Sequence, residues 1–116
     1  MKPATLNLEF TAGDDFVFEF DWEIGDEAVI LTGKTLEMHI KKRKSDATPL
    51  AIATEDIQSP NTGEVRFIMT DEETQELMPQ DKIKSRFFYD VQVTHEDGIK
   101  DTLLKGTFIG EQGVTS

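Results

Sequence analysis

The 116-residue sequence contains no cysteine, which excludes a disulfide framework, a cysteine-based zinc site and a cysteine nucleophile. It also lacks the ~20 consecutive apolar residues that a membrane-spanning helix needs. Residues 1–12 alternate in polarity and do not form the apolar block of a signal peptide. Cations are scarce, and the net charge is −11. Because nucleic acids and anionic membranes attract proteins through cations, we expect no nucleic-acid partner and no membrane partner.

The charge is distributed unevenly along a chain whose length predicts a single domain over residues 1–116, since single cores commonly reach ~100–150 residues. Residues 1–33 carry a net charge of −7 and residues 45–81 a net charge of −8, whereas residues 34–44 carry +4. The remaining residues balance to zero. The chain therefore has one basic island between acidic flanks.

Apolar and polar side chains alternate over most of the chain, which predicts β-strands. The clearest case is Phe16–Ile24, which we expect to form one long strand with an aromatic face and an acidic face. Trp22 in this segment suits a large core residue better than a platform for stacking sugars. Further strands are expected over residues 5–11, 28–31, 35–41, 49–54, 65–70, 86–94 and 100–109.

Turn signals separate these strands, and one short helix interrupts them. Gly13–Asp15 and Glu96–Gly98 have the composition of tight turns. A helix is predicted near residues 71–78, because Thr70 followed by acids is a capping signal and Pro79 ends the segment. Residues 110–116 are expected to form a polar tail. The pattern predicts an all-β, antiparallel β-sandwich of seven or eight strands with one short helix.

No motif in the sequence indicates catalysis, a metal site or a cofactor. His39 and His95 belong to no catalytic motif, and we interpret both as solvated surface side chains. The acids near the N-terminus lack the spacing of a calcium loop, and Gly33–Thr35 matches only the end of a phosphate-binding loop. We therefore expect a protein that is not an enzyme, with no catalytic residue, no metal and no cofactor.

Two charged segments are candidates for contacts with other proteins. On the predicted strand, side chains two residues apart share a face at ~6–7 Å spacing, which suits solvated carboxylates or partners for cations of another chain. The basic run has three interpretations: a solubilising hairpin tip that protects a strand edge, a nucleic-acid patch, or a docking patch for an acidic surface. The candidate contact residues are Glu19, Asp21, Glu23, Lys41, Lys42, Arg43 and Lys44.

The order of several segments along residues 5–110 is similar to that of a known family. These segments are Phe16–Glu23, Leu31–Thr35, Leu36–Lys41, Gly63–Phe67, Asp71–Leu77, Phe88–Val93, Glu96–Gly98 and Leu103–Phe108. In this order the chain resembles the immunoglobulin-like domains of tailed-phage and prophage virion proteins, including the N-terminal domain of baseplate upper proteins.

The resemblance implies an immunoglobulin-like β-sandwich that serves as a structural part of a virion assembled in the bacterial host cytoplasm. It implies a tail, baseplate or capsid adaptor or decoration protein that docks to other virion structural proteins and forms a homo-oligomer within the particle. Family members usually carry further domains for receptor or fibre attachment, and this chain is long enough only for the docking domain. The alternative is a carbohydrate-binding module that recognises host surface glycans, for which Phe88 and Phe108 are the aromatics expected to face outward.

Overall fold

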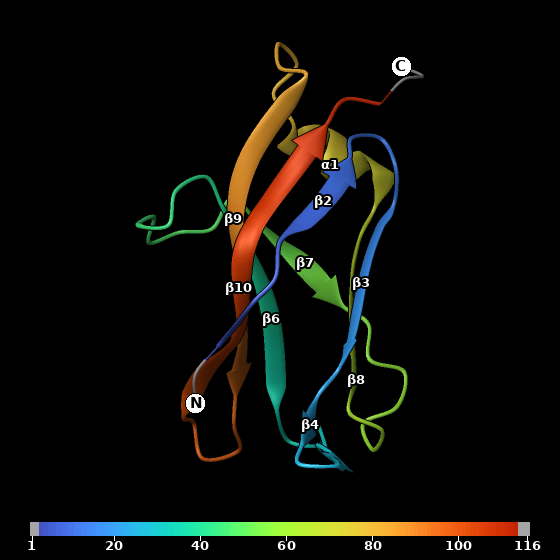
Figure 1. Ribbon diagram of the computed structural model, residues 1–116, viewed down its shortest axis with the longest axis vertical. Coiled ribbons are helices and arrows are strands. Elements are labelled where there is room, and N and C mark those ends of the chain that lie inside the picture. The colour runs from blue at the N-terminus through green and yellow to red at the C-terminus, as the bar shows by residue number, and fades with distance from the viewer. Residues whose placement is uncertain (1–2, 114–116) are drawn as a thin grey trace.

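The computed structural model describes residues 3–113, and β-strands dominate it (Figure 1). Three strands have only two residues: β1 (Ala4–Thr5), β4 (Glu23–Ile24) and β5 (Glu27–Ala28). The seven longer strands in this range are β2 (Leu8–Thr11), β3 (Phe16–Asp21), β6 (Thr35–Lys41), β7 (Ala51–Glu55), β8 (Glu64–Met69), β9 (Lys84–Thr94) and β10 (Lys100–Glu111).

The strands form two layers that one strand connects. The first layer contains β10, β9 and β6 as antiparallel neighbours, and the second contains β8 and β3. Strand β7 belongs to both, because Ala51–Ala53 pair with β6 whereas Thr54 and Glu55 pair with β8. The expected all-β sandwich with one short helix is confirmed. The pairing is not wholly antiparallel, since β1 and β2 both run parallel to β10.

The core lies between the layers and is built mainly from the inward side chains of alternating strands. Phe67 from β8 and Phe87 and Phe108 from β9 and β10 are fully buried. Aromatic rings meet edge-on across the layers. The ring centres of Phe18 and Tyr89 are 6.3 Å apart, and those of Phe16 and Phe108 are 5.0 Å apart. These contacts hold β3 against the larger layer.

Helix α1 (Asp71–Leu77) confirms the predicted helix and its capping signal. The Thr70 side chain accepts a hydrogen bond from the Glu73 amide, and the Glu73 carboxylate accepts one from the Thr70 amide. The buried Thr74 hydroxyl accepts from the Gly13 amide and donates to the Asp14 carbonyl at 2.8 Å. The helix thereby fixes the turn between β2 and β3.

The prediction of one long strand over Phe16–Ile24 is wrong, because the backbone changes its hydrogen-bonding partner at Trp22. The Trp22 amide donates to the Gly63 carbonyl, whereas the Trp22 carbonyl accepts from the Val29 amide, so β3 ends and β4 begins in a separate two-stranded sheet. Gly63 permits this approach, since a Cβ there would lie 2.5 Å from the Trp22 carbonyl oxygen. Ile24, expected on the apolar face, is 64% exposed.

Three other boundaries also differ from the prediction. Of the strand expected over residues 28–31, only Ala28 is in a strand, as the last residue of β5. The strand expected over residues 49–54 is β7, which runs from Ala51 to Glu55. The polar tail does not begin at residue 110, because β10 continues to Glu111 and the Gln112 amide donates to the Ile83 carbonyl. The rest of that predicted tail, residues 114–116, lies outside the described residues.

Candidate functional site

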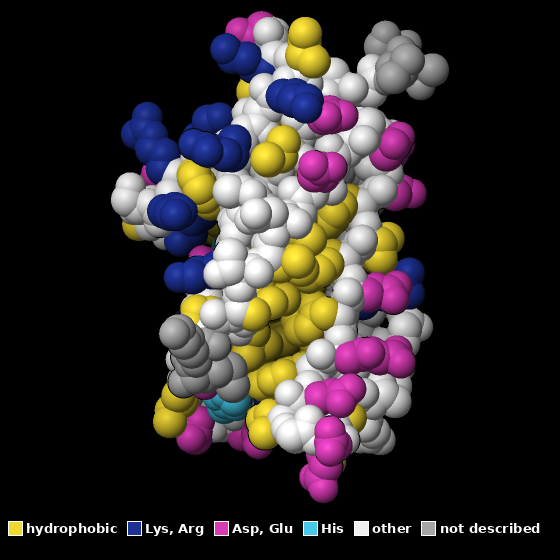
Figure 2. Space-filling view, viewed as in Figure 1, with side chains coloured by type: hydrophobic (Ala, Val, Ile, Leu, Met, Phe, Trp, Pro, Cys, Tyr) yellow, Lys and Arg dark blue, Asp and Glu magenta, His cyan; other side chains and the backbone are white. Residues whose placement is uncertain are grey.

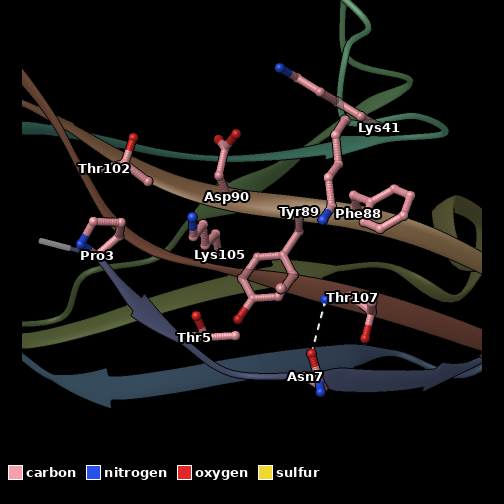
Figure 3. A pocket seen from close by; sticks show the side chains of 12 residues that line it. Pro3, Thr5, Asn7, Lys41, Phe88, Tyr89, Asp90, Thr102, Lys105 and Thr107 are labelled. Atoms are coloured by element: carbon pink, nitrogen blue, oxygen red, sulfur yellow. Dashed lines mark hydrogen bonds between the residues drawn. The ribbon is translucent and has the colours of Figure 1, made fainter.

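A groove of about 500 Å³ lies on the outer face of the larger layer (Figure 3). Strands β6, β9 and β10 form its floor, and the N-terminal segment forms one wall. The figure shows Thr5 and Asn7 on the side of that wall, with Lys41 and Phe88 on the opposite side. The side chains that line the groove include Asn7, Lys41, Lys44, Phe88, Lys105 and Thr107.

Strand register places these side chains together. Lys41 and Thr107 are the neighbours of Phe88 in β6 and β10, so all three project from one row of the sheet. Lys105 lies beside Asp90 in the next outward row. Three residues far apart in sequence therefore meet because their strands pair, and the half-buried Phe88 lies among cations.

Two cations of the basic run, Lys42 and Lys44, lie over aromatic rings. The Lys44 ammonium lies 5.2 Å from the centre of the Phe88 ring, and the Arg86 guanidinium lies 5.6 Å from it. The Lys42 ammonium lies 5.0 Å from the Phe87 ring centre and 3.2 Å from the Ser85 hydroxyl, to which it donates. Such contacts are worth about 0.5–1 kcal/mol each at exposed sites, so they bias the positions of these side chains without fixing them.

The basic run itself crosses from a strand into a loop. Lys41 is the last residue of β6 and is half-buried, whereas Lys42, Arg43 and Lys44 are exposed. The Arg43 amide donates to the Asp46 carboxylate, and the Asp46 amide donates to the Arg43 carbonyl, each at 3.1 Å. These two bonds close a turn. The predicted tip between two strands is confirmed, and two cations of the basic run, Lys41 and Lys44, line the groove.

Hydrogen bonds hold the N-terminal wall of the groove on β10. The Tyr89 hydroxyl donates to the Leu6 carbonyl at 2.6 Å, and the Leu6 amide donates to the Lys105 carbonyl at 3.0 Å. The Thr107 amide donates to the Asn7 side chain at 3.2 Å. Gly106 lies directly beneath, where a Cβ would collide with the Leu6 carbonyl. Burial raises the pKa of Tyr89 to about 12.

The acidic candidates are only partly brought together. Glu19 and Asp21 are exposed on the outer face of β3, as expected, but Glu23 lies beyond Trp22 in β4. Across the strand pair, Asp21 lies beside another acid, Glu64. Glu19 lies opposite Arg66, whose Nε is 3.4 Å from the Glu19 carboxylate. Of the predicted row of three carboxylates, Glu19 and Asp21 therefore remain together on β3, whereas Glu23 is displaced to β4.

Sequence reasoning predicted the outward Phe88 but not the groove around it, and it misplaced Phe108. Phe108 is fully buried. The irregularity between Thr102 and Leu104 shifts the register of β10 by one residue. Side chains after it that simple alternation places outward, such as Phe108, therefore point inward. Only Phe88 of the two expected aromatics therefore reaches the surface.

Both histidines are less exposed than predicted. The His39 side chain is 18% exposed, and its Nε2 lies 3.3 Å from Glu37. The His95 side chain is 23% exposed, with Nε2 2.9 Å from Asp101 and Nδ1 3.4 Å from Lys34. The hydrogen bond from Lys34 also lowers the pKa of Glu96. Within residues 3–113, neither ring is hydrogen-bonded to a hydroxyl.

The part of the chain that the structure describes holds no group of three or more His, Asp or Glu side chains placed to bind a metal ion. No helix of residues 3–113 has the length and apolar character needed to cross a membrane.

Comparisons with known proteins identify no family. No family model matches the sequence, and no curated protein matches it. Among solved structures, murine CRIg aligns over 92% of each chain, with 10% sequence identity and a TM-score of 0.45. The structure itself shows a β-sandwich with a basic groove on one side and an acidic strand on another.

Proposed function

We propose that the protein is a non-enzymatic structural component of a bacteriophage virion, an adaptor or decoration protein of tail, baseplate or capsid. It acts by docking to other virion structural proteins and to copies of itself. The virion assignment rests on the resemblance of residues 5–110, and the docking mechanism rests on the distribution of charge over the surface.

The observation that carries the mechanism is the separation of charge between two sides of one molecule. Figure 2 shows Lys and Arg gathered at the upper left, over β9 and the loop between β6 and β7, with Asp and Glu mainly at the right and lower right, near β3 and β4. The two sides carry Lys41–Lys44 and the acids Glu19, Asp21 and Glu23.

Opposite charges on different patches suit head-to-tail contacts, in which one surface of a molecule meets another surface of its neighbour. Such heterologous contacts build rings when the rotation closes, and rings are a common way to arrange copies around an axis. Two molecules of net charge −11 otherwise repel, so only an orientation that brings the basic patch to an acidic one is favoured.

The test is charge reversal at the basic tip. Lys42→Glu with Arg43→Glu is expected to weaken assembly measured by light scattering, and salt is expected to weaken wild-type assembly because the screening length falls to about 8 Å at physiological ionic strength. Lys100→Glu, compared with the single variant Lys42→Glu, is the matched control, because it makes the same change of charge at an exposed position beside the start of β6, away from the tip. Equal assembly by these two single variants would contradict the charge mechanism.

The virion assignment has its own test. Density for this chain in a reconstruction of the particle is expected, with copies related by the symmetry of tail, baseplate or capsid. A particle of complete composition that lacks the chain would contradict the assignment and leave the docking mechanism to be judged on the variants above.

A second candidate function is recognition of host surface glycans, favoured by the exposed part of Phe88 in the basic groove. Since Lys44 and Arg86 already approach its ring, a neutral sugar would have to displace them, whereas an anionic sugar would pair with them. Binding on a glycan array that Phe88→Ala abolishes would favour this function. Assembly that depends on the basic tip, with no glycan bound, would favour docking.

A further inference from the structure

Strand β3 has an open edge. Among residues 3–113 it pairs with β8 alone and ends the order of strands, so one side of its backbone has no neighbouring strand. Antiparallel pairs alternate between residues that exchange hydrogen bonds and residues whose backbone groups point away from the partner. The pattern of bonds decides which residues of β3 offer free groups.

Two hydrogen bonds identify the residues that face the open edge. The Trp22 amide donates to the Gly63 carbonyl at 2.7 Å, so in this register the bonded residues are even-numbered. Independently, the Arg66 carbonyl accepts from the Asp56 amide at 2.8 Å, on the side away from β3. Its opposite residue, Glu19, therefore directs its own amide and carbonyl outward, and Val17 and Asp21 do the same.

A hollow lined by both acidic and apolar side chains lies beside this edge. A cavity of about 400 Å³ separates β2 from β3 and is lined by Phe10, Phe16 and Val17 among others. Phe16 is half-buried and Val17 is 47% exposed, although both belong to a strand of the core sandwich. Figure 2 shows hydrophobic side chains open to solvent between the β10–β2 side and the β3 side. An added strand would cover them.

The charge around the hollow selects the occupant. Its lining includes the acids Glu9, Asp14, Asp15 and Glu111 but no Lys or Arg. A second copy offering its own β3 would bring acids against acids, which is unfavourable. The basic tip of a second copy is closed in a turn by the bonds between Arg43 and Asp46, so it is not an extended strand.

We propose that the open edge of β3 binds an extended segment of a different polypeptide, in which apolar and basic side chains alternate. The segment adds a strand to the sheet: its backbone pairs with Val17, Glu19 and Asp21, its apolar side chains enter the hollow, and its cations meet the surrounding acids. This deepens the proposed docking function, on which it rests, by giving one partner a defined chemistry.

The probe is an eight-residue peptide of alternating valine and lysine, titrated into the full chain and followed by amide chemical shifts and calorimetry. Saturable binding is expected, with the largest shifts at the amides of Val17, Glu19 and Asp21. The same peptide with glutamate in place of lysine is expected not to bind. No saturable binding of the lysine peptide, or shifts centred on Lys41–Lys44, would overturn the proposal.

A pair of variants separates the contribution of the Glu19 backbone amide to peptide binding from that of its side chain. Glu19→Pro removes the outward amide without removing a bond to β8, and it is expected to weaken peptide binding by about tenfold or more. Glu19→Ala loses the same carboxylate but keeps the amide, and it is expected to weaken binding only a few-fold. Equal binding by both variants would contradict strand addition. If Glu19→Pro does not fold, the amide chemical-shift changes of the wild-type chain on adding the peptide decide whether it binds at the β3 edge.

Two further outcomes have defined meanings. Concentration-dependent dimerisation that Glu19→Pro abolishes and Glu19→Ala retains would make a second copy the occupant and would overturn the choice of a different polypeptide. Because peptide binding is measured on the isolated chain, it is independent of whether the chain is found in a particle. Absence from the virion with intact peptide binding would contradict the proposed function alone.

Discussion

The basic groove and the open edge of β3 are built in opposite ways. Every strand beneath the groove is paired on both sides: β9 lies between β6 and β10, and β10 between β9 and the N-terminal strands. What is offered there is side chains, the cations around Phe88. At β3 the side chains of Glu19 and Asp21 add charge, but the distinctive feature is a row of free backbone groups beside a hollow of acidic and apolar side chains.

This difference implies different kinds of binding. A surface of mobile cations on a complete sheet attracts partners over a long range and tolerates variation in their sequence, and salt weakens it. A sheet edge requires an extended partner in a fixed register, and most of the attraction comes from short-range hydrogen bonds and apolar contact. The two stability predictions that follow perturb the wall of the groove while leaving the β3–β8 pair intact.

The largest expected effect is that of Gly106→Ala, which acts on the wall of the groove. A Cβ at residue 106 would collide with the Leu6 carbonyl, and such overpacking costs about 3 kcal/mol of unfolding free energy. Chemical denaturation measures the loss. Lys105→Ala, an exposed neighbour, is the control and is expected to change stability by less than about 0.5 kcal/mol. Similar losses in both variants would show that the N-terminal segment does not depend on close contact at Gly106.

A smaller effect is expected of Tyr89→Phe, which removes the hydrogen bond to Leu6 and costs about 1 kcal/mol at neutral pH. The pKa of Tyr89 is raised from 10.0 to about 12 by burial, so the folded state holds this proton more tightly than the unfolded state. The contribution is therefore complete below pH 10 and is lost as the pH rises from 10 to about 12.

The chain has one tyrosine, so tyrosinate absorbance reports this group alone. The wild-type protein is expected to lose stability more steeply than Tyr89→Phe over that pH range. Its tyrosinate absorbance is expected to rise near pH 12 rather than near pH 10. An absorbance midpoint near pH 10, or parallel stability curves for the two proteins, would show that the hydroxyl is not held in the folded state as described.

The parts of the fold that depend on neighbouring residues in sequence could be predicted. Alternation identified the longer strands, and Thr70 with Glu73 identified the start of the helix, because both signals act within a few residues. The basic run was correctly placed at the end of a strand for the same reason. Glu19 and Asp21 share their face because they lie two residues apart on one strand.

The parts that depend on distant residues could not be predicted. Strand β3 ends at Asp21 because Trp22 meets Gly63 and Val29, and no signal within Phe16–Ile24 marks that change. The irregularity at Thr102–Leu104 reverses the faces of β10, which is why Phe108 is buried. The groove is likewise a product of strand pairing, since Lys41, Phe88 and Thr107 meet only through their register.

The most direct test of docking between the two sides is a mixing experiment with complementary charge reversals. One variant carries Lys42→Glu and Arg43→Glu, and the other carries Glu19→Lys and Asp21→Lys. Each alone has lost one half of the contact, so light scattering at low salt is expected to show no assembly of either. The equimolar mixture restores opposite charges across the contact, and it is expected to assemble. A mixture that stays as dispersed as its components, while the wild-type chain assembles, would contradict the proposal that these patches meet.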